Sequence, residues 1–183
     1  MFVYPKKFRQ LADLHFTPLS VAKTAASFLV THARTKVLDV GAGAGKFCLV
    51  GACTTQGVFT GIEQREELVD LSSRIARQYQ LANVSFIHAN VMSIDFTTFD
   101  AVYFFNPFYE NMNSGKQIDD AVLMNPALFR TYTSYVYSQL EAMKAGTRLV
   151  TYYSSSMRPP HDYELVNSGE EGNLLMWQKR VGN

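Results

Sequence analysis

The 183-residue chain lacks the residue patterns that mark several specialised classes of protein. Its two cysteines, Cys48 and Cys53, match no zinc or redox spacing, and we expect both to be small core residues of a reduced protein. The four histidines are scattered without a metal-ligand pattern, so no metal site is expected. No apolar run reaches 18 residues and the first ten residues lack the apolar core of a signal peptide, which predicts a cytoplasmic protein without a membrane-spanning helix.

An excess of charge of one sign is also lacking. Lysine and arginine total 17 against 16 aspartate and glutamate, giving a net charge of +1. Unaided nucleic-acid binding depends on cations that neutralise phosphates, so the composition carries no strong nucleic-acid signature. The basic residues Lys6, Lys7 and Arg9 are expected to form a solvated arm. The length predicts a single domain over residues 1–183, with an irregular leader at 1–16.

Apolar runs and helical periodicity alternate along the chain. Together they predict an α/β fold, a Rossmann-like doubly wound mixed sheet of about seven strands with helices on both faces. A C-terminal antiparallel hairpin is predicted because turn residues 168–172 separate the last two apolar runs. Only Ser154 to Pro160 separate the fifth predicted strand from the sixth, so we expect the helix that usually connects them to be missing or reduced to one turn. The predicted strands are 37–40, 57–63, 84–88, 99–105, 147–153, 163–167 and 174–180, and the predicted helices are 17–29, 46–54, 65–79 and 126–144. The last helix is expected to turn an apolar and aromatic stripe that includes Tyr132 toward the core.

A glycine-rich loop, Gly41-Ala42-Gly43-Ala44-Gly45, follows the first predicted strand and its acid, Asp39. Glycines let the backbone come close to a ligand, and the first N–H groups of the next helix point to the same place. A P-loop is excluded because Phe47 stands where a hydroxyl is required. A dinucleotide fingerprint fits poorly, because Lys46 occupies the position of its third glycine.

The spacing Asp39-x-Gly41-x-Gly43-x-Gly45 is similar to motif I of class I S-adenosyl-L-methionine (SAM)-dependent methyltransferases, and the resemblance extends from about residue 16 to the C-terminus. It implies SAM as the cofactor and S-adenosylhomocysteine (SAH) as its product. The acid after the first strand would balance the cofactor ammonium, and Glu63 would accept hydrogen bonds from the ribose hydroxyls. The resemblance implies a cofactor site formed by Phe16, Thr17, Asp39, Gly41, Ala42, Gly43, Gly45, Glu63, Gln64, Asn90, Val91 and Asn106.

The segment Asn106-Pro107-Phe108-Tyr109 follows the fourth predicted strand. It is similar to the [D/N/S]-P-P-[Y/F/W] motif of enzymes that methylate amino groups on planar systems, although the second proline is Phe108 here. In those enzymes the polar side chain and the next backbone carbonyl orient the amine, and the aromatic ring stacks on it. All four residues are therefore predicted to be catalytic.

Two looser resemblances bear on the methyl acceptor. Phe16-Thr17-Pro18 is similar to motif X of adenine-N6 DNA methyltransferases, with Thr17 expected as the N-cap of the following helix. Gly61-Ile62-Glu63 and the loop after strand four resemble those of non-SET histone lysine methyltransferases. We also expect Tyr4, His15, Phe16 and residues 110–118 to form a lid or substrate wall.

The predicted function is methyl transfer from SAM to an acceptor, with an amino nitrogen as the expected target. The acceptor itself is unidentified: a small molecule, a protein side chain and an RNA base all remain open. Two alternatives remain, a SAM-fold binding module that has lost catalysis and, with less support, an NAD-binding oxidoreductase.

Overall fold

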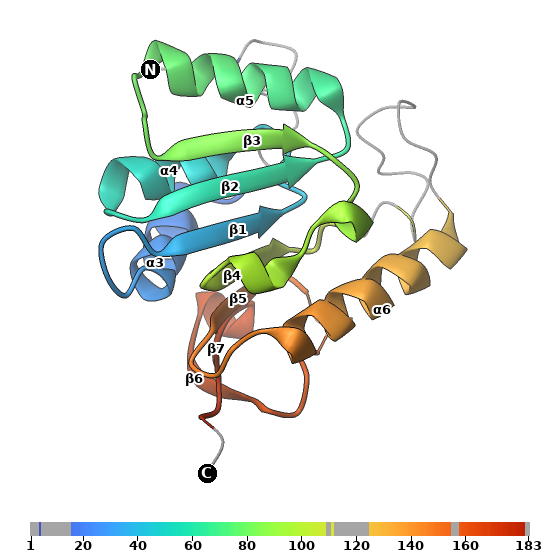
Figure 1. Cartoon of the computed structure of the whole chain (residues 1–183). Coiled ribbons are helices and arrows are strands. Elements are labelled where there is room, and N and C mark those ends of the chain that lie inside the picture. The colour runs from blue at the N-terminus through green and yellow to red at the C-terminus, as the bar shows by residue number, and fades with distance from the viewer. Residues whose placement is uncertain (1–3, 5–15, 109–110, 112–124, 155–157, 182–183) are drawn as a thin grey trace.

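A seven-stranded sheet forms the centre of the computed structural model, which describes residues 4, 16–108, 111, 125–154 and 158–181 (Figure 1). The strand order is β3-β2-β1-β4-β5-β7-β6. The first five strands are parallel, and β7 runs antiparallel to both of its neighbours. The predicted mixed sheet with a C-terminal hairpin is therefore confirmed. The strands are β1 (Lys36–Val40), β2 (Val58–Glu63), β3 (Val84–His88), β4 (Ala101–Phe105), β5 (Arg148–Tyr152), β6 (Tyr163–Gly169) and β7 (Leu174–Lys179).

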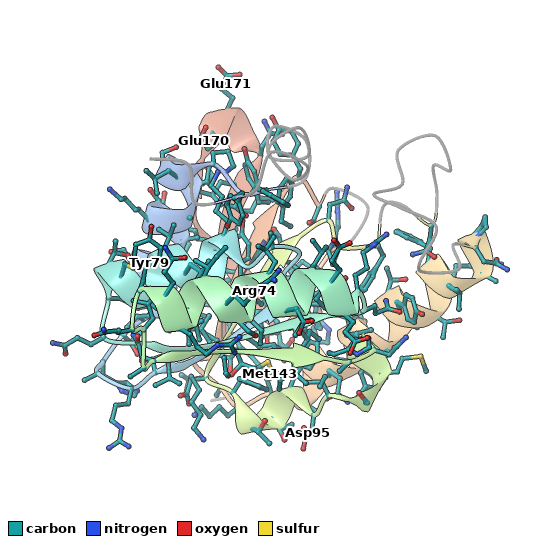
Figure 2. All side chains as sticks on the ribbon, turned by 90° about the horizontal axis from the view of Figure 1, so that it is seen from above. Arg74, Tyr79, Asp95, Met143, Glu170 and Glu171 are labelled. Atoms are coloured by element: carbon teal, nitrogen blue, oxygen red, sulfur yellow. The ribbon has the colours of Figure 1, made fainter. Side chains whose placement is uncertain are left out.

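Helices cover both faces of this sheet. One face carries α3 (Leu19–Leu29), α4 (Lys46–Thr54) and α5 (Glu66–Gln78). The other carries α6 (Pro126–Ala142) and the short 3₁₀-helices η1 (Val91–Ser93) and η2 (Phe96–Thr98). Figure 2, viewed from above, shows α3 on one side of the sheet and α6 on the other. Arg74 of α5 and Tyr79, the residue that follows this helix, are labelled there, and both are exposed.

Strand β4 lies in the middle of the sheet and is buried on both sides. Side chains alternate along a strand, so Tyr103 joins the core under α3 and α4 whereas Phe104 joins the core under α6. The Tyr103 ring stacks on Phe47 of α4 with 3.8 Å between centroids. This double burial explains why β4 reads as an unbroken apolar run.

The start of α3 differs from the prediction. Pro18, and not Thr17, is the N-cap residue, and it makes no side-chain capping bond. The Thr17 hydroxyl is instead hydrogen-bonded to the Tyr103 hydroxyl at 2.9 Å, and both side chains are buried. The capping role was therefore wrong because a tertiary partner on β4 takes up the hydroxyl.

Two further expectations concern cysteine burial and the link from β5 to β6. Cys48 is buried in the core, but Cys53 is exposed near the end of α4, so the expectation was wrong for Cys53. The described residues between β5 and β6, which are 153–154 and 158–162, form no helix.

The hairpin holds the C-terminal end of α6 through Lys179. Its ammonium group donates to the carbonyls of Leu140 at 3.0 Å and Glu141 at 2.7 Å. It also pairs with the Asp162 carboxylate at 2.9 Å, and the lysine side chain is only 9% exposed. A buried cation at a helix C-terminus satisfies carbonyls that have no partner within the helix.

Replacing Lys179 by methionine should therefore destabilise the fold. The substitution keeps the apolar stem but removes the ammonium donor of the Glu141 carbonyl and of the half-buried Asp162, whereas the Leu140 carbonyl keeps the Tyr163 hydroxyl as a donor. We expect the free energy of unfolding to fall by about 2–4 kcal/mol in urea titrations. Lys144→Met, which removes the exposed pair with Asp100, is the control and should cost under about 1 kcal/mol. Equal losses in the two variants would contradict the role given to Lys179.

Candidate cofactor and acceptor site

The loops after β1 and β4 touch at the point where the strand order reverses. Ligands of open α/β sheets bind at this place, beyond the carboxyl ends of the strands. Gly41, in the loop after β1, has φ +72°. A Cβ atom there would lie 2.4 Å from the Cβ of Pro107, in the loop after β4. The predicted cofactor loop and the predicted catalytic segment are therefore in direct contact, and only glycine permits it.

The glycine loop is held in place by its own backbone. The N–H of Ala42 donates to the Ile62 carbonyl at 2.8 Å, and the N–H of Gly43 donates to Glu63 Oε2 at 3.0 Å. Gly45 is the N-cap of α4 with φ +74°, and a Cβ atom there would lie 2.5 Å from the Phe86 ring. These bonds tie the loop to the end of β2.

Glu63 lies at the carboxyl end of β2 and is 7% exposed. Its Oε1 atom accepts from the backbone N–H groups of Gln64 at 2.9 Å and Arg65 at 3.0 Å, and the Arg65 guanidinium lies 3.7 Å away. Burial raises the pKa of this carboxyl, and Arg65 with the backbone donors partly offsets the shift. Oε1 is thus fully used, whereas Oε2 accepts one bond within the protein and has room for a second donor.

Asp39 is buried beneath the same loop, at 3% exposure. Its Oδ2 atom accepts a hydrogen bond from the Cys48 thiol at 3.3 Å. Burial raises the pKa of Asp39 to about 7, the thiol bond lowers it, and the charge of Glu63 raises it further. Burial also raises the pKa of Cys48 well above its usual range, so the thiol stays protonated and can donate. A buried carboxyl group whose pKa is raised by burial and by a second carboxyl group nearby suits a cationic ligand.

Two aromatic rings cover the loop on the α4 side. Phe16 is 5% exposed, and its ring lies 3.9 Å from the position of a Cβ built on Gly43. Tyr4 packs on Phe16 with 5.2 Å between centroids, and its hydroxyl donates to the Ala44 carbonyl at 3.2 Å. Tyr4 and Phe16, two members of the predicted wall, therefore lie at the glycine loop. The other members, His15 and residues 110–118 with the exception of Asn111, lie outside the described residues.

Asn90 follows β3 and is the N-cap of η1. Its Oδ1 atom accepts from the Met92 backbone N–H at 2.9 Å. Its amide nitrogen donates to Gln64 Oε1 at 3.2 Å and to the hydroxyl of Tyr132 at 2.9 Å. The predicted neighbour Val91 is buried in the core under α6. Asn90 and Gln64 thus come together at the ends of β2 and β3.

Asn106, the first residue after β4, has the unusual φ of +39°. Its backbone N–H donates to Ser154 Oγ at 2.9 Å, and that hydroxyl donates in turn to the Tyr152 carbonyl at 3.0 Å. Ser154 therefore ties the loop after β4 to the end of β5. A small cavity of about 10 Å³ adjoins the loop, lined by Phe104, Asn106, Pro107, Phe108, Phe129, Thr133 and Ser154.

Phe108 turns into the core beside this cavity and is 5% exposed. Its ring lies between Phe104, at 5.9 Å, and Tyr132 of α6, at 5.3 Å. Asn106 and Pro107 are half-buried and form the more accessible part of the segment. Tyr109, the fourth predicted catalytic residue, lies outside the described residues.

Three site residues were missed from the sequence. Cys48 was assigned only to the core and Tyr132 only to an apolar helix stripe, and both do lie in the core. Their polar atoms nevertheless contact Asp39 and Asn90. Ser154 had one available signal, since it is a polar residue just after a strand at the carboxyl edge where the other site residues gather.

Metal and membrane sites were also sought in the described part of the chain. No group of three or more His, Cys, Asp or Glu side chains among those residues could hold a metal ion. None of the described helices is long and apolar enough to cross a membrane.

Comparison with known proteins identifies the family. A family model described as a methyltransferase domain matches residues 31–171. The release factor glutamine methyltransferase of Buchnera aphidicola subsp. Baizongia pistaciae (strain Bp) is 32% identical over 112 residues, which cover 60% of this chain and 40% of that protein. The matched region is thus well under half the length of this curated relative.

Solved structures share the fold at low sequence identity. TrmN from Thermus thermophilus has a TM-score of 0.66 and 16% identity, covering 94% of this chain and 52% of its own. An RNA methyltransferase from Salinibacter ruber, solved in complex with SAH, has a TM-score of 0.63 and 18% identity, covering 91% and 95% of the two chains. The family model begins before β1 and ends between β6 and β7, so it includes the loops after β1 and after β4. The chain therefore belongs to the methyltransferase-domain family, within the class I SAM-dependent methyltransferases.

Proposed function

We propose that this methyltransferase transfers the methyl group of SAM to an amino nitrogen held by Asn106 and Pro107. The observation that carries the proposal is the contact of Gly41 with Pro107, which sets the acceptor loop directly against the cofactor loop. Methyl transfer requires little more than alignment of the two reactants and exclusion of water, and adjacency of the two loops supplies the alignment.

The donor atoms around the glycine loop fit the chemistry of SAM. SAM carries a sulfonium, an ammonium and a carboxylate, and when bound it supplies an electrophilic methyl group. Asp39 would balance the ammonium, and Glu63 would accept a ribose hydroxyl on Oε2, the oxygen with room for another donor. Asn90 Oδ1, with one lone pair beyond its bond to Met92, would accept from the adenine amino group.

Asn106 would act on the acceptor through hydrogen bonds. The side-chain carbonyl of Asn106 and the backbone carbonyl of Pro107 would each accept from an amine N–H, which turns the nitrogen lone pair toward the methyl group. SAM, when bound, would supply the methyl group and leave as SAH with the electrons of the broken sulfur–carbon bond on sulfur, and the methylated nitrogen would lose its proton to solvent. Ser154 fixes this geometry by holding the backbone of Asn106 at its positive φ.

The curated relative favours a nitrogen acceptor, whereas the solved structures that share the fold include both N- and O-methyltransferases and leave the acceptor atom open. The Buchnera relative is named for glutamine, whose side chain carries an amide nitrogen. Coclaurine N-methyltransferase is among the proteins that share the fold, with 15% identity and a TM-score of 0.53. Because RNA methyltransferases share it too, an RNA base amine stays within the proposal.

The direct test is transfer of labelled methyl from SAM into fractionated lysate, with mass spectrometry to find the modified atom. We expect the label on nitrogen, and Asn106→Ala should lower transfer at least 100-fold while SAH affinity changes under threefold. Asn167→Ala, on the exposed edge strand β6, is the control and should behave as wild type. Label on oxygen, or an active Asn106→Ala, would overturn the proposal, and a complete lack of transfer would favour a SAM-fold binding module.

The raised pKa of Asp39 predicts pH-dependent cofactor binding. Below about pH 7 the unliganded carboxyl is protonated, so binding an ammonium must first remove that proton. Affinity for SAH should therefore rise about tenfold between pH 6 and pH 8 in calorimetric titrations. Asp39→Asn should bind more weakly and show a flat profile over this range. A wild-type profile that is also flat would rule out Asp39 as the titrating group.

Loss of the Ser154 hydroxyl should impair transfer more than binding. Ser154→Ala removes the acceptor for the Asn106 N–H, so the positive φ is no longer supported. We expect about a tenfold lower kcat, roughly one hydrogen bond, with SAH affinity within twofold of wild type. Ser154→Thr should recover part of the rate because it keeps a hydroxyl. Ser138→Ala, on the exposed face of α6, is the matched control. Unchanged kcat in Ser154→Ala would contradict this role.

A further inference from the structure

Tyr132, in the middle of α6, contacts both halves of the site. Its hydroxyl accepts a hydrogen bond from the Asn90 amide nitrogen at 2.9 Å. Its ring packs on Phe108 with centroids 5.3 Å apart and planes inclined by 43°. The side chain is 5% exposed. One buried residue thus joins the loop after β3 to the loop after β4.

The Tyr132 hydroxyl helps to hold the Asn90 amide in one orientation. The Met92 backbone N–H needs an acceptor, so Oδ1 must point toward it. The amide nitrogen then points toward Tyr132 and Gln64, both of which offer an oxygen. Met92 therefore sets the orientation that an adenine amino group requires of the Asn90 carbonyl, and Tyr132 with Gln64 anchors the amide in it.

The ring packs against the loop after β4 on the side that faces the core under α6. Phe108 is two residues after Asn106 and is held between Phe104 and Tyr132. Aromatic pairs at this separation contribute beyond the area that they bury, so the position of Phe108 depends on α6. A shift of Tyr132 at its hydroxyl end would reach the acceptor loop through its ring.

We propose that Tyr132 is a positioning residue that couples adenine binding at Asn90 to the geometry of the acceptor loop at Asn106–Phe108. The inference rests on the proposed function, because it takes Asn90 as the adenine contact and the loop after β4 as the acceptor site. It goes further by assigning specificity and coupling to a helix residue that touches neither reactant.

A tyrosine one turn further along the same helix provides a matched control. Tyr135 is half-buried, and its hydroxyl donates to the Ile94 carbonyl at 2.9 Å. Its ring packs on Phe96 at 6.5 Å in the same core, and its partners Ile94 and Phe96 follow η1, so it contacts neither Asn90 nor the loop after β4. Tyr135→Phe therefore removes a comparable hydrogen bond without touching the site.

The experiment measures base selectivity and loop protection in Tyr132→Phe. Affinities for SAH and S-inosylhomocysteine, which has a carbonyl in place of the adenine amino group, are compared by calorimetry. Amide hydrogen exchange of Asn106 and Phe108 is followed by NMR with and without SAH. We expect Tyr132→Phe to lose three- to tenfold in SAH affinity and under twofold for the inosine analogue. The protection that SAH gives to the loop amides should fall by a similar factor.

The outcomes distinguish the proposed coupling through Tyr132 from the proposed function on which it rests. Tyr135→Phe should keep the wild-type ratio of the two affinities. If Tyr132→Phe also keeps that ratio and the wild-type loop protection, Tyr132 is only a core residue and the inference is wrong. Asn90→Ala tests the proposed adenine contact itself, since it should abolish the preference for SAH over S-inosylhomocysteine. If Asn90→Ala keeps that preference, Asn90 does not bind adenine, and the coupling through Tyr132 is wrong as well. If Asn90→Ala loses the preference but Tyr132→Phe keeps it, only the coupling through Tyr132 is refuted.

Discussion

The absent side chain at Gly41 is the constraint on which the site depends. Strands β1 and β4 are neighbours in the sheet, so their loops leave the carboxyl edge side by side. They can touch only because no Cβ stands between Gly41 and Pro107. That contact fixes the distance between the loop proposed to hold the cofactor and the loop proposed to hold the acceptor, and such preorganisation reduces the entropy lost when reactants are aligned.

Around this contact the protein buries polar groups that a purely structural core would avoid. The charge of Glu63 adds to the effect of burial in raising the pKa of Asp39, and the Cys48 thiol donates a hydrogen bond to the Asp39 carboxylate. Burying a carboxyl group in this way costs stability unless a cation compensates. The arrangement is understandable where a cationic cofactor binds, and perturbed acids commonly mark functional sites for this reason.

The sequence predicted what local patterns determine and missed what depends on contacts across the fold. Hydrophobic periodicity located the strands and helices, and the glycine spacing marked the tight loop proposed to hold the cofactor, since both are properties of short segments. Thr17 was assigned to a helix cap because local sequence does not show its hydrogen-bond partner Tyr103, which is 86 residues away. Tyr132 was assigned to an apolar stripe because its polar partner Asn90 lies 42 residues earlier and is equally invisible to a local pattern.

The most direct test of the central contact is a double-mutant cycle between Gly41→Ala and Pro107→Gly, with SAH affinity as the readout. Gly41→Ala introduces a Cβ against Pro107, and Pro107→Gly removes the atom that it would meet. We predict that Gly41→Ala weakens binding at least tenfold more in the wild-type background than in Pro107→Gly. Equal losses in the two backgrounds would show that the loops do not depend on each other, and would contradict the account.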